Sequence, residues 1–378
     1  MLRVVPARAA DLLPALAAAL DGTGPAVVPE VPGLAALRPA EPLEDDEVVL
    51  VVPTSGSTGE RKGVLLPAGN VRCSAAATAI RLGGHGQWLL AIPPSHVGGL
   101  QVLVRSLLAG TDPVALPAGS FTAGAFVACT ARLGGLRRYV SLVPTQLRRL
   151  LTAGDAATDA LRTYDAVLLG GAATPAPLLA AAKEAGVPVV PTYGMSETAG
   201  GCVYDGAPLD GVTVRIAPDG RIRLSGPVVA RGYRLRPDLT ALAFSDGSFR
   251  TGDLGVLLPD GRLQVLGRAD DVIVSGGEKV SPAAVEDALA QHPAVVESAV
   301  VGVPDEEWGQ RVVAYAVLRQ PLSLQAAREH VVARLPRAWA PRELREVVEL
   351  PRLTTGKIDR PALRSGTAGQ PASPGGES

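Results

Sequence analysis

The hydrophobic positions of this 378-residue chain change their spacing along its length. Up to about residue 200, Ala- and Leu-rich helical segments alternate with short apolar runs at 47–52, 88–94, 138–144, 166–171 and 188–194. Short apolar runs that alternate with helices are typical of buried strands in a parallel sheet. The first part of the chain is therefore expected to form a large α/β domain.

From about residue 210 the pattern becomes strictly alternating. Pro-Asp-Gly turns join alternating runs within 212–226 and 255–268, which predicts hairpins and a small antiparallel region, so the sheets of the large domain are mixed.

The pattern changes once more near residue 270. Residues 281–293 are predicted to form a helix, with Ser281 as its N-cap and Pro282 at its first position; a strand at 295–304 and a helix near 323–335 follow. This is the pattern of a small α+β domain. We expect the large domain at 1–267, a hinge at 268–271, the small mobile domain at 272–364, and a disordered tail at 365–378, because the tail carries no apolar run.

Amino-acid composition and net charge limit the classes of partner and site that are expected. Apolar residues make up 47% of the chain and the net charge is −1, so nothing in its charge favours nucleic acid or an anionic membrane, and small-molecule partners are expected. The cysteines are three, widely spaced and without a C-x-x-C pair, which fits a reducing cytoplasm rather than a disulfide framework or a zinc site. The apolar N-terminal stretch is interrupted by Asp11, Pro14 and Asp21, and its spacing indicates a surface helix rather than a membrane span.

The stretch TSGSTGERKG at 54–63 combines glycines, hydroxyl groups and positive charge directly after a buried strand. Glycines allow backbone N–H groups to approach an anion, and the hydroxyl groups and a lysine add donors and charge. A flexible surface turn is the simpler alternative. A Walker A loop is excluded, because Arg61 and Gly63 stand where that motif needs Gly and Ser or Thr. The candidate phosphate-binding residues are Thr54, Ser55, Gly56, Ser57, Thr58, Gly59 and Lys62.

Lysine is rare in this arginine-preferring chain. Of the lysines at 62, 183, 279 and 357, all but Lys183 lie in Gly-rich or turn-rich contexts, where a compact ammonium could reach a phosphate, although chance could also place them there.

Five motifs occur in a fixed order: TSGSTGERKG at 54, YGMSE at 193, TGD at 251, GRADDVI at 267 and LTTGK at 353. Together they resemble the acyl-adenylate-forming superfamily, which includes acyl- and aryl-CoA synthetases, adenylation domains and luciferases. The resemblance spans nearly the whole chain. It implies an ATP-dependent enzyme that uses Mg²⁺, and it implies that the loop at 54–63 binds the phosphates of ATP.

The resemblance assigns further residues to the nucleotide. Glu197 is expected to hold Mg²⁺ through a carboxylate oxygen, and Ser196 to donate to the α-phosphate. Tyr193 is expected to stack on adenine beside the backbone of Gly171 and Ala172, although a tyrosine there could simply fill the end of a strand.

The remaining assignments concern the ribose and the moving parts. By resemblance, Asp253 and Arg268 bind the ribose, and Lys357 stabilises the charge that grows as the substrate carboxylate attacks the α-phosphorus. Asp270 corresponds to the family hinge, about which the small domain exchanges the face carrying Lys357 for a CoA-binding face. The loop on that second face is marked by Gly276, Gly277 and Lys279.

Within the superfamily, the segments at 140–151 and 195–212 resemble the o-succinylbenzoate–CoA ligases of menaquinone biosynthesis, in the short form found in actinobacteria. This implies activation of o-succinylbenzoate through an acyl-adenylate and its transfer to coenzyme A. A CoA ligase for another aromatic or short-chain acid, or a stand-alone adenylation enzyme that loads a carrier protein, remains the alternative; a binding module without activity is a third reading.

By the same resemblance, His96 stands at the family's position for a bulky gate between the ATP site and the acyl pocket, and with Glu197 and Lys357 it completes the candidate catalytic set. Because the N-terminal region is short, the acyl pocket is expected either to be more open or to be completed by a second subunit in a homodimer. The candidate pocket residues are His96, Ser141, Thr145, Gln146, Gly194, Gly200 and Gly201.

Overall fold

The computed structural model describes residues 2–55, 61–352 and 358–365. The predicted phosphate-loop residues Gly56, Ser57, Thr58 and Gly59, the predicted catalytic Lys357, and nearly all of the predicted tail lie outside these ranges. The chain divides into two compact units. The first comprises residues 1–174, 178–251 and 256–264, and the second comprises residues 175–177, 252–255 and 265–378.

A five-stranded sheet in the first unit carries the predicted phosphate loop at one end of a hairpin. Its order is β1-β2-β3-β4-β14; β1, β2 and β3 are parallel, whereas β4 runs antiparallel to both β3 and β14. The strands are β1 (Arg3–Val5), β2 (Val27–Pro29), β3 (Val48–Ser55), β4 (Arg61–Pro67) and β14 (Gly232–Tyr233).

A seven-stranded sheet forms the centre of the first unit, in the order β11-β10-β9-β8-β7-β5-β6. Strands β5 to β9 are parallel, and β10 runs antiparallel to β9. The strands are β5 (Gln87–Leu90), β6 (Val114–Ala115), β7 (Arg138–Leu142), β8 (Ala166–Leu169), β9 (Val189–Met195), β10 (Gly200–Tyr204) and β11 (Ala207–Pro208).

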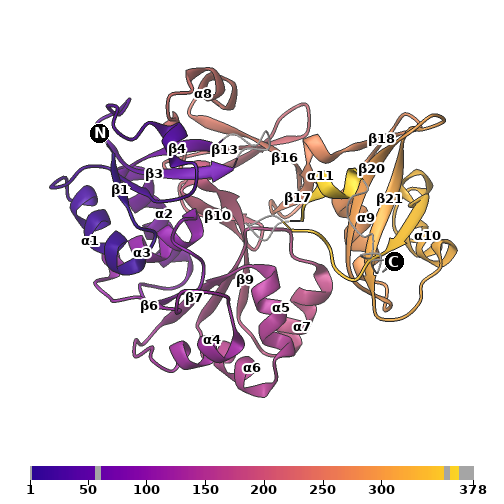
Figure 1. Cartoon of the computed structure of the whole chain (residues 1–378), viewed down its shortest axis with the longest axis horizontal. Helices are drawn as coiled ribbons and strands as arrows, with labels where there is room; N and C mark the ends of the chain where they lie inside the picture. The colour runs from indigo at the N-terminus through magenta and orange to yellow at the C-terminus, as the bar shows by residue number, and fades with distance from the viewer. Residues whose placement is uncertain (1, 56–60, 353–357, 366–378) are drawn as a thin grey trace, which may run out of the picture. The chain divides into compact units, whose positions relative to one another are not determined.

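Helices cover both faces of this sheet. Successive residues of its buried strands point alternately into two apolar clusters, one on each face. Tyr139 and Leu168 share one cluster with the helices α1 (Ala9–Leu20), α2 (Ala68–Arg81) and α3 (Val97–Ala109) and with the inner face of the five-stranded sheet. Val140 and Val167 point to the opposite face. Figure 1 shows the helices of that face grouped together: α4 (Ala123–Thr130), α5 (Pro144–Thr152), α6 (Asp155–Arg162) and α7 (Ala176–Glu184).

A third, antiparallel sheet contains the predicted hairpins. Its order is β12-β13-β16-β15, with β17 paired to β16, and the division between the two units passes along β16 and β17. The elements are β12 (Thr213–Ile216), β13 (Arg221–Ser225), α8 (Pro237–Ala243), β15 (Phe244–Ser245), β16 (Ser248–Leu257) and β17 (Leu263–Arg268).

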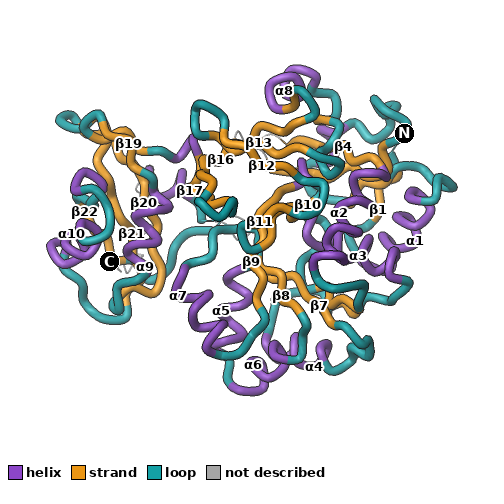
Figure 2. Tube along the Cα trace, turned by 180° about the vertical axis from the view of Figure 1, so that it is seen from behind, coloured by secondary structure: helices purple, strands orange, loops and turns teal. Residues whose placement is uncertain are grey.

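The second unit is a sheet in the order β19-β18-β21-β20, with β22 parallel to β21. One face is covered by α9 and α10, which lie side by side in Figure 2, and the other face packs against α11. The elements are β18 (Ile273–Ser275), β19 (Glu278–Val280), α9 (Pro282–Ala290), β20 (Val295–Asp305), β21 (Gly309–Leu318), α10 (Leu324–Val332), β22 (Glu343–Glu346) and α11 (Arg360–Arg364).

The predicted fold class is confirmed: a large α/β part with mixed sheets precedes a small α+β part. The small part also has its predicted N-cap, because the Ser281 hydroxyl accepts a hydrogen bond from the backbone N–H of Ala284 at 3.3 Å. Within the described ranges, no helix is long and apolar enough to cross a lipid bilayer.

Candidate active site

The predicted site residues of the first unit follow the carboxyl ends of neighbouring parallel strands. His96 follows β5, Thr145 follows β7, Gly171 follows β8, and Ser196 and Glu197 follow β9. In open α/β sheets, ligands bind outside these strand ends, because the loops that follow parallel strands converge there. The fold therefore brings together residues that are up to 101 positions apart in the sequence, from His96 to Glu197.

A tight turn presents Glu197 at the end of β9. The turn is the 3-10 helix η2 (Ser196–Thr198), and it closes on Ala199, whose φ of 51° is left-handed. Two buried side chains donate to the carbonyl of Ala199 and hold it in place: the Ser74 hydroxyl at 3.0 Å and the Gln101 amide at 2.7 Å. The direction in which Glu197 leaves the sheet is thus fixed by α2 and α3.

Glycines allow β9 to lie close to β10 and to the turn that follows β8. A Cβ atom on Gly194 would lie 2.2 Å from the carbonyl oxygen of Gly200, so only glycine fits where β9 and β10 pair. Similarly, a Cβ atom on Gly170 would lie 2.4 Å from the hydroxyl oxygen of Thr192. The predicted adenine-binding backbone after Gly170 therefore comes against the strand that carries Tyr193.

The segment 54–63, predicted to bind phosphate, joins two antiparallel strands. Thr54 pairs with Lys62 in the β3–β4 register, and the Thr54 hydroxyl donates to the carbonyl of Lys62 at 3.4 Å. A Walker A loop instead leads from a strand into a helix. The structure therefore agrees with the sequence argument that excluded that motif.

Lys62 and Glu197 share a neighbour that the sequence did not reveal. The Tyr233 hydroxyl donates to Oε1 of Glu197 at 2.8 Å, and Nζ of Lys62 lies 5.2 Å from the centre of the Tyr233 ring. In the sequence Tyr233 is one of six tyrosines and follows a glycine in RGYR, which indicates only a turn or an edge strand.

The predicted acyl-pocket residues differ in burial and in the contacts of their side chains. Ser141 is buried on β7, and His96 is exposed at the N-terminus of α3. Gln146 is engaged with backbone groups: its amide donates to the carbonyl of Ala91 at 2.9 Å, and its oxygen accepts from the N–H of Val143 at 3.0 Å. These contacts make Gln146 a link between the end of β5 and the start of α5.

In the second unit, the two predicted ribose-binding residues lie together. Arg268 Nη1 lies 3.5 Å from Oδ1 of Asp253, and Nη2 donates to the predicted hinge residue Asp270 at 3.4 Å. A Cβ atom on Gly252 would lie 2.6 Å from the Arg268 guanidinium, so the glycine of the TGD motif makes room for this arginine.

An ion-pair network ties helix α11 to the residue next to the predicted hinge. Arg360 binds both carboxylate oxygens of Glu286, at 2.6 and 3.0 Å, and its Nε lies 3.5 Å from Asp271. Arg364 also donates to Asp271, at 3.0 Å. Burial raises the pKa of Glu286, and the paired guanidinium of Arg360 opposes that shift. We name this set, Asp271, Glu286, Arg360 and Arg364, the α11 anchor.

Helix α11, which carries Arg360 and Arg364 of the anchor, directly follows the segment that contains Lys357. The residues that flank positions 353–357 are held together: Arg352 and Ile358 form an antiparallel bridge, and the N–H of Asp359 donates to the carbonyl of Pro351 at 2.8 Å. The described residues on either side of the predicted catalytic segment are therefore joined to each other within the second unit.

The predicted CoA-face loop is a tight hairpin between β18 and β19. Gly276 and Gly277 form its two-residue turn, with φ of 59° and 81°, which is the geometry of a type I′ turn. A Cβ atom on Gly276 would lie 2.7 Å from the Trp308 ring. Lys279 is exposed on β19 beside this turn.

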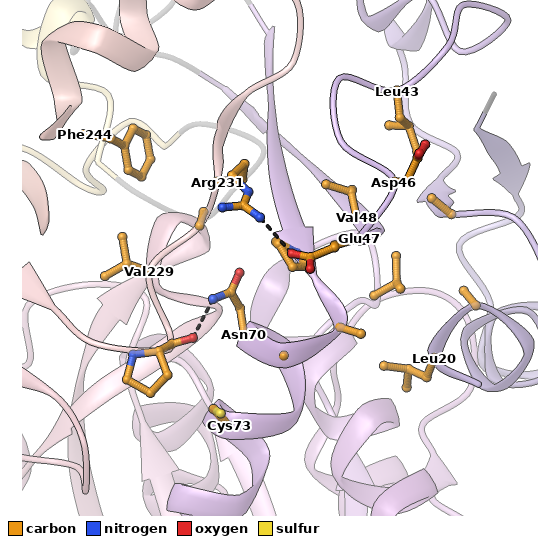
Figure 3. Close-up of a pocket in the computed structure, with 18 of the residues that line it drawn as sticks. Leu20, Leu43, Asp46, Glu47, Val48, Asn70, Cys73, Val229, Arg231 and Phe244 are labelled. Atoms are coloured by element: carbon orange, nitrogen blue, oxygen red, sulfur yellow. Dashed lines mark hydrogen bonds and ion pairs between the residues drawn. The ribbon is translucent and has the colours of Figure 1, made fainter. Parts of the chain in front are cut away.

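A cavity of about 1180 Å³ opens at the other end of the β3–β4 hairpin, where Val48 begins β3 and Pro67 ends β4. None of the predicted site residues lines it. Its charged lining is mainly acidic, and Arg231, which faces Glu47 in Figure 3, is paired with that carboxylate at 2.7 Å. A polyphosphate would be repelled there, so this cavity is no candidate for the nucleotide.

Comparison with known proteins identifies the family. The family model for the AMP-binding enzyme matches residues 6–234, and the model for the AMP-binding enzyme C-terminal domain matches residues 284–357. The chain belongs to the AMP-binding enzyme family. The resemblance inferred from the five ordered motifs is thereby confirmed for this AMP-binding enzyme.

Relatives of this AMP-binding enzyme carry a more specific name. A probable 2-succinylbenzoate–CoA ligase of Mycobacterium tuberculosis strain H37Rv is 50% identical over 381 residues, which cover 97% of this chain and 98% of the relative. The o-succinylbenzoate CoA synthetase of Bacillus subtilis, solved with its acyl-adenylate intermediate, is 30% identical with a TM-score of 0.76 and covers 94% of this chain and 81% of its own. The same synthetase, solved with ATP and magnesium ion, is 32% identical with a TM-score of 0.72, over 85% of this chain and 70% of its own.

Proposed function

We propose that the chain is an AMP-forming o-succinylbenzoate–CoA ligase of menaquinone biosynthesis. The observation that carries this proposal is the 50% identity to the Mycobacterium tuberculosis relative over nearly the full length of both chains. The reaction has two half-reactions on one scaffold. In the first, a carboxylate oxygen of the acid attacks the α-phosphorus of ATP and pyrophosphate leaves; in the second, the CoA sulfur attacks the acyl carbon, the thiol proton is lost and AMP leaves.

The strand ends of the first unit suit the triphosphate. Lys62 supplies a cation at the base of the phosphate loop, and Ser196 and Glu197 present oxygen groups after β9. Mg²⁺ prefers hard oxygen ligands and is usually held by one or two carboxylates together with substrate phosphates, which fits a single glutamate at this position. Among the described residues, no three His, Cys, Asp or Glu side chains cluster as a protein-only metal cage. Magnesium, held by Glu197, would neutralise charge on the phosphates, and Lys62 and Ser196 would donate to the phosphate oxygens.

The nucleoside is assigned to neighbouring groups. Tyr193 is expected to stack on adenine next to the backbone of Gly171 and Ala172, which follow β8, the strand that pairs with β9. Asp253 accepts from the ribose hydroxyls, and Arg268, whose Nη1 lies 3.5 Å from the Asp253 carboxylate, donates to the ribose beside it.

The second unit provides the moving parts. Lys357 stabilises the charge that develops between two anions during adenylation. A turn at Asp270 then presents the hairpin of Gly276, Gly277 and Lys279 for the CoA step. The bridge between Arg352 and Ile358, which flank positions 353–357, supports this assignment, because a cation that stabilises a transition state must be held in place by its surroundings.

The acid itself sets a requirement on the pocket. o-Succinylbenzoate keeps an aromatic carboxylate that does not react, and burying this charge without partners would cost several kcal/mol. We assign its partners to the hydroxyl groups of Ser141 and Thr145 and to backbone N–H groups near Gly200 and Gly201, with His96 as the gate. Gln146 holds the helix that carries Thr145.

The test compares o-succinylbenzoate with 4-phenyl-4-oxobutanoate, which lacks only the ring carboxylate. CoA thioester formation is followed by mass, and kcat/KM is expected to fall on the order of 10²-fold or more for the analogue, because a site built for a polar group rejects ligands without it. Benzoate and medium-chain fatty acids serve as further controls. Equal kcat/KM values for the two keto acids would contradict the assigned substrate.

The proposal also includes a location in the cell and an oligomeric state. The three cysteines, Cys73, Cys129 and Cys202, are free thiols, which supports an enzyme of the reducing cytoplasm that acts on small molecules. A homodimer in which a second subunit completes the acyl pocket stays a prediction.

A further inference from the structure

Tyr233 touches two charged groups of the proposed nucleotide site at once. Its hydroxyl donates to Oε1 of Glu197 at 2.8 Å, while the face of its ring lies 5.2 Å from the Lys62 ammonium. The residue is only 7% exposed, so both contacts are largely shielded from water. Shielding strengthens each contact relative to one at the surface.

The fold defines the position of this ring. Tyr233 pairs with Val64 where β14 joins β4, two residues beyond Lys62 along the same strand. Its N–H donates to the Thr240 hydroxyl at 2.9 Å, and Phe244 packs edge-on against its ring with the centroids 5.4 Å apart. The ring is thus held from β4, α8 and β15.

The same segment also grips the backbone of the metal-binding turn. The N–H of Ala230 donates to the carbonyl of Glu197 at 2.9 Å, three residues before Tyr233. Main chain and side chain of Glu197 are therefore both fixed by residues 230–233. A glutamate has three side-chain torsions, and holding them in the free enzyme removes an entropic cost from ligand binding.

The chemistry of the contacts leaves both charges usable. A phenol hydroxyl is neutral at physiological pH, so it can occupy one carboxylate oxygen without cancelling the negative charge that a cation needs. A ring face attracts an ammonium through its quadrupole and leaves the ammonium charged. An arginine or lysine in place of the tyrosine would instead neutralise Glu197 and repel Lys62.

We propose that Tyr233 is a positioning residue that holds Glu197 and Lys62 in the arrangement that receives Mg²⁺ and the phosphates of ATP. This inference rests on the proposed function. It assigns Tyr233 two separable contributions: the hydroxyl orients the metal ligand, and the ring orients the phosphate-binding cation.

The experiment measures ATP binding by isothermal titration calorimetry over a series of Mg²⁺ concentrations, without any acid substrate. Tyr233→Phe keeps the ring and loses the hydroxyl, so the Mg²⁺ concentration for half-maximal effect should rise about 10- to 100-fold, the usual cost of losing a partner that orients a metal ligand. ATP affinity without Mg²⁺ should stay within about twofold, since the ring remains. Tyr233→Leu should weaken ATP binding without Mg²⁺ as well, by about two- to fivefold, because it also removes the ring face.

Tyr204→Phe is the matched control. It removes another buried tyrosine hydroxyl, which bonds to Thr78 at 3.0 Å and to Arg105 at 3.4 Å instead of a site residue. It should lower thermal stability in the absence of ligand and leave the Mg²⁺ dependence of ATP binding unchanged. An equal Mg²⁺ shift in Tyr233→Phe and Tyr204→Phe would overturn the positioning role.

A double-mutant cycle with Glu197→Gln separates orientation from general damage. If the hydroxyl acts through the carboxylate, adding Tyr233→Phe to Glu197→Gln should shift the Mg²⁺ dependence no further. Additive shifts contradict the proposal, and so does wild-type ATP binding that ignores Mg²⁺. A wild-type chain that binds Mg²⁺ and ATP as expected but forms no thioester from o-succinylbenzoate contradicts only the proposed substrate.

Discussion

Arg234 offers a sharp test of how the first unit is held together. Its side chain is completely buried, and its five N–H donors are directed at five acceptors in the segment 37–44. Its own backbone N–H donates to Gly63 on β4, so the same residue joins this segment to the phosphate-loop hairpin. The acceptors are the carbonyls of Leu37, Arg38, Glu41 and Pro42 and the carboxylate of Glu44, at 2.6–3.1 Å.

Replacing Arg234 with Met keeps an apolar side chain of similar length and removes all five hydrogen bonds. Bonds to a charged group each contribute about 1.5–3 kcal/mol, but most residues of the segment 38–44 are half-exposed or exposed, so water can satisfy part of the acceptors after the change. The Glu44 side chain is 33% exposed, so water can also solvate its charge; we expect the segment to lose about 3–5 kcal/mol of protection, the contribution of about two such bonds.

Native-state hydrogen exchange, resolved by peptides that cover residues 37–48, measures this quantity. Exchange in Arg234→Met should be about 10²- to 10⁴-fold faster than in the wild type. Arg234→Lys should lose most of the protection too, because an ammonium has three donors and cannot match the guanidinium fork. Arg236→Met is the matched control, since Arg236 forms an ion pair with Asp238 only two positions away at the surface. Unchanged protection in Arg234→Met, or the same loss in Arg236→Met, would refute the reasoning.

Two further predictions concern single residues. Lys357→Ala should slow adenylation on the order of 10²- to 10³-fold while CoA transfer from supplied acyl-adenylate survives, because only the first half-reaction needs the cation; single-turnover assays of each half-reaction check this, and an equal fall in both would contradict the exchange of two faces. Burial raises the pKa of the Cys202 thiol to about 12, so at pH 8 it stays protonated, and iodoacetamide should modify Cys202 only in urea. Peptide mass mapping follows the modification, and rapid labelling of the native protein would show that the thiol is accessible.

The sequence predicts the framework well, for a local reason. Each motif directly follows or contains an apolar run, so the residues after 88–94, 166–171 and 188–194 are expected at strand ends once the runs are recognised as parallel strands. The helix that begins after Ser281 is likewise predicted from its N-cap residue, Ser281 itself. Elements of this kind depend on neighbours only a few positions away.

The contacts that hold the site depend on distant partners instead. Tyr233 meets Glu197 across 36 positions, and Arg234 meets Leu37 across 197 positions. The dipeptide Tyr-Arg in RGYR has no periodicity that indicates either partner, because the pairing arises only when β14 adds to the edge of β4. A single sequence therefore predicts which charged groups lie at the site, but it does not predict which residues hold those groups in place.

Gln146 shows how a polar residue in the right segment can serve the backbone. It stands at the third position of α5, where the first N–H groups of a helix lack partners within the helix. Its side-chain oxygen accepts from the N–H of Val143, the residue before the helix, at 3.0 Å. The sequence-based reading assigned its amide to the substrate, and nothing in the local pattern distinguishes the two uses.

The α11 anchor has a consequence for the timing of the reaction. Arg360 and Arg364 join α11, the helix after segment 353–357, to Asp271 beside the proposed hinge and to α9 and β20. A turn at Asp270 that brings one working face of the small unit forward must then withdraw the other by the same angle. On the proposed function, the face that carries Lys357 and the CoA hairpin are then used in alternation, so the acyl-adenylate meets the thiol only after the adenylation step is complete.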